Sequence, residues 1–210
     1  MADAAAGEPV GIFFNCPFDT DYKPIFHALV FAAFDCGFWP RCALEIDDGA
    51  QTRISKIIAI MKQCPLGVHD ISRTELDAAT QLPRFNMPFE LGLFIGARAF
   101  GGPDQRRKSC LILDVAPCRY QKFLSDIAGQ DIQAHGGQTE AAIQALRRWL
   151  STVARDRRLP GDQAIIGRHR AFLRALPLIL RGMELAEAEM TFADFAHIAS
   201  GWLREQPRTG

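Results

Sequence analysis

Short apolar segments alternate with amphipathic helical segments along most of this chain, and this alternation restricts the fold more than any other feature. The clearest segment, residues 108–115 (KSCLILDV), is a continuous apolar run of the kind that forms the centre of a parallel sheet. Further strands are expected at residues 10–15, 38–44 and 66–72, with a shorter fifth near residues 130–134. The spacing matches repeated β-α-β units, so the sequence predicts an open, doubly wound, mostly parallel α/β sheet of four to five strands over residues 8–155.

The intervening and C-terminal segments follow helical spacing. Residues 22–36 and 52–63 each place apolar side chains on one side, with Gly37 ending the first helix. Pro40 favours an edge position or an irregular start for the strand at residues 38–44. Residues 156–210 contain only helical patterns, which predicts a helical C-terminal extension. There Thr191 and Asp194 resemble a capping box. The apolar stripe behind that box has to pack, either on the α/β unit or on a second chain.

Composition excludes several classes of protein. The 24 basic and 24 acidic residues cancel, which argues against nucleic-acid binding or an anionic membrane as the main partner. No apolar run reaches the roughly 18 residues of a membrane span. The six cysteines form no CxxC pair and lie mostly in apolar stretches, so we expect a reducing, cytoplasmic location and no metal or other cofactor. The N-terminus has neither the basic nor the apolar region of a signal peptide.

The segment Asn86-Met-Pro-Phe-Glu-Leu-Gly places a carboxylate, Glu90, at the start of a predicted helix. Asn86 is a favoured N-cap residue, and Pro88 suits the first turn because its missing N–H has no helical partner there. Free N–H groups at a helix start stabilise negative charge, so Glu90 is expected to stay ionised at neutral pH. Two interpretations follow: Glu90 complements the helix dipole, or it acts as a nucleophile or stabilises a cation.

Candidate ligand-binding residues follow the ends of two predicted strands. The first strand ends with Phe14, Asn15 and then Pro17-Phe18, and the third ends with Asp70 and Ser72. Ligands of open parallel sheets bind at the carboxyl ends of strands, so these groups and the Glu90 helix are expected at one edge. The Phe18 ring suits contact with a flat ring, and Asn15 and Asp70 offer hydrogen bonds. Asp70 could equally cap the turn that follows it, and the neighbouring His69 is better explained as a histidine packed under a helix.

In its order of motifs the chain resembles the nucleoside 2-deoxyribosyltransferase-like superfamily, whose fold is related to TIR domains. The resemblance is carried by NCPFD after the first strand, by HDIS after a later one, and by NMPFELG, over roughly residues 10 to 150. It implies that Pro17 and Phe18 line a base pocket, that Asp70 binds nucleobase or sugar, and that Glu90 acts at the anomeric carbon. Phe14, Asn15, Ser72 and Asn86 are the further residues expected to contact the ligand.

Two departures favour hydrolysis over base exchange. Asn86-Met87-Pro88 replaces the small residues common before the family's Phe-Glu, and the C-terminal segment of the transferases is not recognisable. We therefore expect cleavage of the N-glycosidic bond of a nucleotide or of NAD⁺, as in effectors of bacterial anti-phage systems. The alternatives are a non-catalytic nucleotide-sensing or scaffolding module that signals through its C-terminal helices, and a cysteine-dependent enzyme using Cys16 with His27 or His69. A homo-oligomer or a partner protein bound through the C-terminal helices is also expected.

Overall fold

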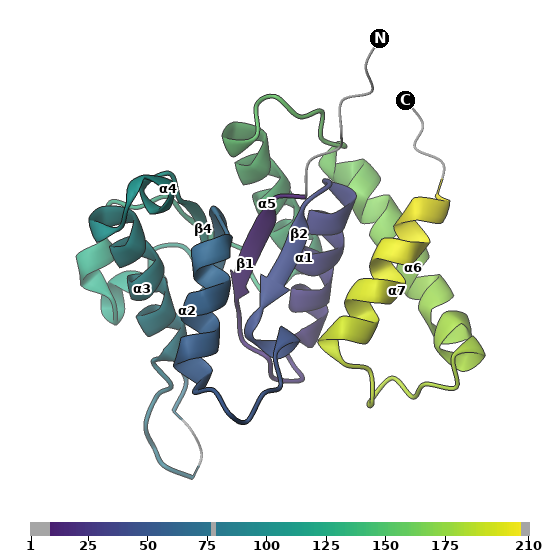
Figure 1. The fold of residues 1–210 in the computed structure, drawn as a ribbon, viewed down its shortest axis with the longest axis horizontal. Helices are drawn as coiled ribbons and strands as arrows, with labels where there is room; N and C mark the ends of the chain where they lie inside the picture. The colour runs from purple at the N-terminus through teal and green to yellow at the C-terminus, as the bar shows by residue number, and fades with distance from the viewer. Residues whose placement is uncertain (1–8, 77–78, 207–210) are drawn as a thin grey trace.

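A five-stranded sheet organises this protein, whose computed structural model describes residues 9–76 and 79–206 (Figure 1). The strands are β1 (Gly11–Asn15), β2 (Trp39–Cys42), β3 (Leu66–Asp70), β4 (Ser109–Asp114) and β5 (Ile132–Ala134). They pair in the order β2-β1-β3-β4-β5, and every pairing is parallel. The predicted α/β fold class is confirmed. Pro40 lies on the edge strand β2 and the KSCLILDV segment forms the interior strand β4, as the sequence predicts.

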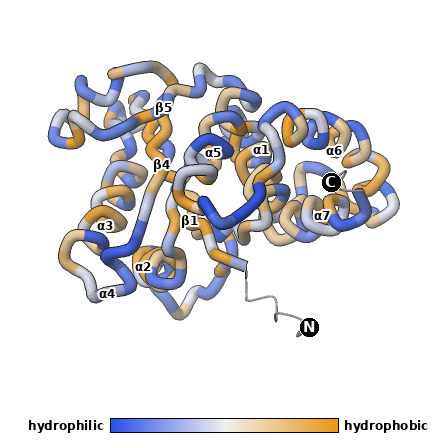
Figure 2. The backbone as a smooth tube through the Cα atoms, turned by 90° about the horizontal axis from the view of Figure 1, so that it is seen from above, coloured by the Kyte–Doolittle hydropathy of each residue, from blue (hydrophilic) through white to orange (hydrophobic). Residues whose placement is uncertain are grey.

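Helices cover both faces of the sheet. The helices are α1 (Lys23–Asp35), α2 (Arg53–Gln63), α3 (Asn86–Phe100), α4 (Pro103–Arg106), α5 (Thr139–Val153), α6 (Asp162–Gly182) and α7 (Phe192–Glu205). Viewed from above, α2 and α3 lie on one side of the strands and α1 and α5 on the other (Figure 2). Side chains of a strand alternate between faces, so Phe14 of β1 packs under α1 while its neighbour Phe13 packs with α2 and α3.

The two C-terminal helices pack on the outer side of α1, away from the sheet (Figure 2). Phe31 of α1 stacks on Phe172 of α6 at 5.1 Å between ring centroids, and His27 stacks on Phe195 of α7 at 3.8 Å. The predicted capping box is present, because the Thr191 side chain accepts from the Asp194 N–H and the Asp194 carboxylate accepts from Thr191. The apolar stripe of the extension is therefore buried within the chain and shares one core with the α/β unit.

Helix α1 ends where the sequence places its end. Gly37 has φ of 79°, a left-handed conformation that suits glycine, and its N–H donates to the Phe34 carbonyl. The next N–H, of Phe38, donates to the Ala33 carbonyl, which completes a Schellman motif. This turn leads directly into β2, whose first residue, Trp39, pairs with Gly11 at the start of β1.

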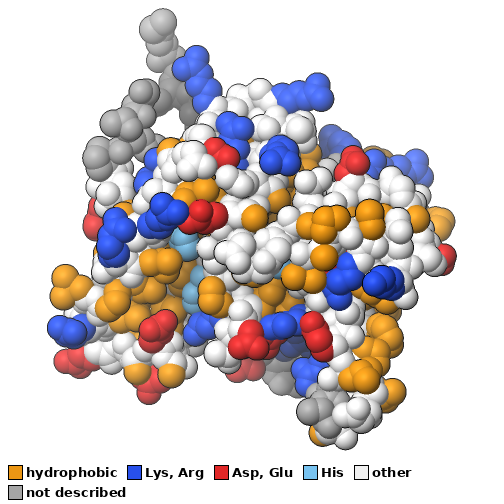
Figure 3. All heavy atoms as spheres, turned by 180° about the vertical axis from the view of Figure 1, so that it is seen from behind, with side chains coloured by type: hydrophobic (Ala, Val, Ile, Leu, Met, Phe, Trp, Pro, Cys, Tyr) orange, Lys and Arg blue, Asp and Glu red, His pale blue; other side chains and the backbone are white. Residues whose placement is uncertain are grey.

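Some segments differ from the sequence prediction. Between β4 and β5, where helical spacing predicts a short helix, the chain forms two short 3-10 turns, η2 (Arg119–Lys122) and η3 (Ser125–Ile127), and a third, η1 (Ala43–Glu45), follows β2. The start of the expected α3 is also shifted, as described below. No helix in the described parts of the chain is long and apolar enough to cross a membrane. Acidic and basic side chains are interspersed over the face seen in Figure 3, in line with the balanced charge.

Candidate functional site

A cavity of about 580 Å³ opens at the carboxyl edge of the sheet, beyond the end of β1. Its volume lies within the roughly 300–1,000 Å³ of small-molecule sites, and its place is the usual one for ligands of open parallel sheets. We call it the inner cavity. Three of the predicted ligand contacts line it together with three arginines: Pro17, Phe18, Asn86, Arg53, Arg73 and Arg84.

The Pro17-Phe18 loop is held in place by an ion pair. Arg73, after β3, donates from Nε and one terminal nitrogen to the two oxygens of Asp19, at 3.0 and 2.5 Å. Partial burial of Asp19 acts to raise its pKa, but the hydrogen bonds from Arg73 and from the Tyr22 N–H, together with the Arg73 charge, outweigh burial and hold the pKa below its ordinary value. Asp19 therefore stays ionised and paired, and it is a poor proton donor near neutral pH.

Glu90 lies in the second turn of α3, and the expected position in the first turn is wrong. The helix begins at Asn86 with Phe85 as the N-cap residue, and the N–H of Phe89 donates to the Phe85 carbonyl. Asn86 is therefore the first residue of the helix and not, as the sequence predicts, its N-cap. Glu90 follows Asn86 and Met87 at helical i, i+4 and i, i+3 spacing, so it lies one turn further along the same side of α3 as these two cavity-lining residues.

Burial dominates the electrostatics of Glu90. The residue is 5% exposed, and loss of solvent raises its pKa from 4.5 to about 7, against the opposing effect of Arg53. The expectation that the helix start keeps Glu90 fully ionised at neutral pH is thus wrong, since the helix dipole acts only in the first turn. Among the described residues the carboxylate has no hydrogen bond and no ion pair. Glu90 is not itself among the residues that line the inner cavity.

Asn15 ties the end of β1 to the Glu90 helix. Its Nδ2 donates to the Met87 carbonyl at 2.9 Å and lies 3.1 Å from Nδ1 of His69 on β3. The His69 ring packs on Phe94 of α3 at 4.8 Å, and burial lowers its pKa to about 3, so the ring is neutral. Glu90 is located between Met87 and Phe94 along α3, over the ends of β1 and β3. Asn15 therefore positions the helix, and its buried Oδ1 has no hydrogen-bond partner in the described residues.

Asp70 lies on the opposite face of the sheet and is fully buried. Its Oδ2 accepts from the Tyr22 hydroxyl at 2.6 Å, and its Oδ1 accepts from the Ser72 N–H at 2.8 Å. Nδ1 of His135 accepts from the Gly137 N–H, so the proton of that ring is on Nε2, which lies 3.0 Å from Oδ2 without hydrogen-bond alignment. These contacts match the interpretation of Asp70 as a group that caps its own turn and joins α1, β3 and β5.

The remaining predicted residues lie apart from Glu90. Phe14 is in the core under α1, against Phe26. Ser72 lines a separate cavity of about 180 Å³, next to Tyr22 and His135. Cys16 borders the inner cavity, but burial raises the pKa of its thiol well above the ordinary value, with the Asp70 charge adding to the effect. That environment disfavours a thiolate nucleophile, and His27 and His69 are engaged with Phe195 and Asn15.

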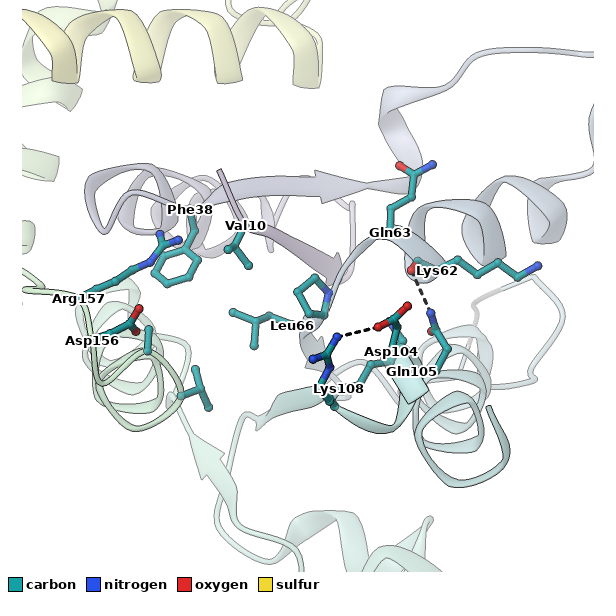
Figure 4. Close-up of a pocket in the computed structure, with 14 residues that line it drawn as sticks. Val10, Phe38, Lys62, Gln63, Leu66, Asp104, Gln105, Lys108, Asp156 and Arg157 are labelled. Atoms are coloured by element: carbon teal, nitrogen blue, oxygen red, sulfur yellow. Dashed lines mark hydrogen bonds and ion pairs between the residues drawn. The ribbon is translucent and has the colours of Figure 1, made fainter. Parts of the chain in front are cut away.

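Another cavity, of about 490 Å³, lies at the amino ends of the strands (Figure 4). Several charged side chains of this cavity already contact other groups of the protein: Arg107 pairs with Asp104 at 2.7 Å, and Arg157 lies over the Phe38 ring at 4.7 Å. This edge is also not the one at which ligands of open parallel sheets bind. The inner cavity with Glu90 is therefore the better candidate site.

Sequence reasoning missed the cations of the site, Arg53 and Arg73. The cue for Arg53 is that it directly follows Thr52, whose side chain caps α2 and fixes that helix start at the edge of the sheet. The described residues hold no cluster of three or more side chains suited to a metal ion. Comparison with protein-family models, with curated proteins and with solved structures gives no match for this chain.

Proposed function

We propose that this protein cleaves the N-glycosidic bond of a nucleotide or of NAD⁺, and that Glu90 attacks the anomeric carbon or stabilises its positive charge. The observation that supports this most is the Glu90 carboxylate itself, which is buried without a hydrogen-bond or ion-pair partner in the described residues and lies one helical turn after the cavity-lining Asn86 and Met87. A buried, unpaired carboxylate costs stability, and such groups are concentrated at functional sites.

In the proposed reaction the bond between the anomeric carbon and the base nitrogen breaks, and its electron pair leaves with the base. The sugar becomes cationic, and the ionised Glu90 stabilises that cation more than it stabilises the neutral ground state. Water then adds to the anomeric carbon and loses a proton to solvent, either directly or after hydrolysis of a sugar ester on Glu90. Phe18 and Pro17 provide the surface for the base, and Arg53 attracts the phosphate.

The site contains few proton donors. Besides Glu90, the acid nearest the base surface is Asp19, which Arg73 keeps ionised. A neutral base departs as an anion unless it is protonated, whereas the nicotinamide of NAD⁺ starts cationic and departs neutral. This chemistry favours NAD⁺ or another nucleotide with a cationic base over ordinary nucleosides.

A non-catalytic nucleotide-sensing module is the second candidate, because residues just before α7 border a cavity that adjoins the inner one. A ligand there could shift the C-terminal helices toward or away from a partner. The resemblance further suggests a bacterial defence effector, a role to be tested by phage plating on cells that express the wild type or Glu90→Gln.

Release of free base separates the two candidates. Purified protein is incubated with NAD⁺ and a panel of nucleotides, and free base is measured by chromatography for the wild type, Glu90→Gln and the exposed control Glu187→Gln. The proposal expects release by the wild type and the control, with loss of several orders of magnitude in Glu90→Gln. Binding without any release would favour the sensing module.

A further inference from the structure

A second cavity, of about 640 Å³, adjoins the inner one and is called here the outer cavity. The two share Phe18, Leu44 and Arg53 as common lining residues. The outer cavity lies between the start of α1, the segment after β2, the start of α2 and the chain just before α7. Its far wall contains Met190 and Phe192, which belong to the C-terminal helical extension.

Two cations line the outer cavity, and one of them, Arg53, also lines the inner cavity. Arg53 is exposed in the shared wall, and the half-buried Lys23 lines the outer cavity. Neither has a hydrogen bond or ion pair with any other described residue. Lys56, by contrast, donates to the Ile46 and Asp48 carbonyls at 3.2 Å each. Lys23 and Arg53 are therefore available for an anion that passes between the cavities.

The outer cavity has an aromatic wall beyond these cations. Phe26 is in edge contact with Phe18 at 5.2 Å and packs with Phe192 at 5.8 Å between ring centroids. Beside them His27 lies flat on Phe195, and burial, helped by the Lys23 charge, lowers its pKa to about 4, so its ring is neutral at pH 7. This aromatic part of the wall suits a flat base through ring contacts, while the rest of the lining also includes the charged side chains of Asp47 and Lys56.

In space, Glu90 is followed by the inner cavity, by Arg53 in the shared wall, and by the outer cavity with Lys23 and an aromatic wall. We propose that the outer cavity binds the distal nucleoside of a dinucleotide whose pyrophosphate contacts Arg53 and Lys23, so that the substrate class is a pyrophosphate-linked dinucleotide such as NAD⁺. This inference rests on the proposed function for the identity of the inner cavity. It also assigns a role to the C-terminal extension, which completes the outer cavity within the same chain.

Binding of ADP-ribose, which lacks the nicotinamide leaving group of NAD⁺, tests the outer cavity without release of nicotinamide. Its Kd is measured by calorimetry for the full-length wild type, Lys23→Gln, Thr20→Trp and Lys62→Gln. Thr20 is exposed and lines only the outer cavity, and Lys62 is an exposed lysine at the opposite edge of the sheet. We expect Lys23→Gln to weaken binding about tenfold, the size of one charge-assisted contact, and Thr20→Trp to weaken it at least as much. Lys62→Gln should leave the Kd unchanged.

The KM values of NAD⁺ and nicotinamide mononucleotide, measured on the same proteins, keep the two proposals separate. Dinucleotide binding predicts a lower KM for NAD⁺, with the advantage reduced in Lys23→Gln. The outer-cavity assignment would be overturned if nicotinamide were released equally from NAD⁺ and nicotinamide mononucleotide and if the ADP-ribose Kd were the same in the wild type, Lys23→Gln and Thr20→Trp. The proposed function would then still stand. If ADP-ribose binding depended on Lys23 but no base were released, the outer-cavity assignment would stand and the proposed function would be overturned. Failure of ADP-ribose to bind the wild type would also overturn the assignment.

Discussion

Replacement of Glu90 by Gln is expected to stabilise the protein above neutral pH, although it should abolish activity. The folded state holds the Glu90 pKa at about 7 against an ordinary 4.5, so between these pH values it binds more protons than the unfolded state. The free energy of unfolding therefore falls as pH rises from about 4.5 to about 7. The whole difference corresponds to roughly 3 kcal/mol, because each pKa unit is worth about 1.36 kcal/mol.

Glutamine has nearly the same shape and carries no charge, so it avoids this penalty. At pH 8 Glu90→Gln should therefore be more stable than the wild type by up to about 3 kcal/mol, and near pH 4.5 the two should differ little. For a chain of this length each kcal/mol moves Tm by about 2–4 °C, which gives a rise of up to about 10 °C at pH 8. Thermal unfolding followed by circular dichroism from pH 4.5 to 8 measures the effect.

Glu187→Gln is the matched control, because it removes an exposed carboxylate and should leave the pH dependence of Tm unchanged. If Glu90 served only the helix dipole, Glu90→Gln would lose about 0.3–1 kcal/mol of stability at neutral pH and gain none at pH 8. That result would refute the reasoning from burial. A gain in stability with a loss of activity is the pattern expected of a group retained for chemistry.

Three further predictions concern the surroundings of Glu90 and the fold. Arg53→Gln removes the charge that opposes the rise in the Glu90 pKa, so the rising limb of the kcat/KM profile should move to higher pH; an unmoved limb would show that Arg53 does not act on Glu90. Asp70→Asn weakens the Tyr22 hydrogen bond and the His135 contact, so Tm should fall by the equivalent of about 2–4 kcal/mol while the Kd for ADP-ribose survives; weaker binding at unchanged Tm would restore Asp70 as a ligand contact. Removal of residues 156–210 uncovers the outer side of α1 and should give aggregation or association in light scattering, whereas a soluble monomer of native Tm would contradict the shared core.

The sequence predicts the features that depend on local pattern. Alternating apolar runs give the parallel sheet, Pro40 marks the edge strand, and Gly37 and Thr191 mark a helix end and a helix start. These are choices of backbone conformation and capping made within a few residues. For this reason they can be read without knowledge of the tertiary contacts.

The electrostatics of the site depend on distant contacts and cannot be read in this way. The Glu90 pKa follows from burial in the folded chain and from the charge of Arg53, and the Asn15 amide donates to a carbonyl 72 residues away. That Asp70 and Glu90 lie on opposite faces of the sheet can, however, be inferred from the sequence, because successive residues of a strand point to opposite faces. His69 pairs in register with Asn15 on the face of α3, so Asp70 has to lie on the other face. Which face α3 covers, however, is set by the chain connections.

The central claim is that the Glu90 carboxylate takes part in breaking an N-glycosidic bond, and single-turnover measurement of base release tests it most directly. Wild type, Glu90→Gln and Glu187→Gln are each mixed in excess with NAD⁺, and released nicotinamide is followed from pH 5 to 9. The account predicts a wild-type rate that rises through pH 7 as Glu90 ionises, an equal rate for Glu187→Gln, and a rate lower by several orders of magnitude for Glu90→Gln with the ADP-ribose Kd retained. Release by Glu90→Gln at a rate near that of the wild type would contradict it.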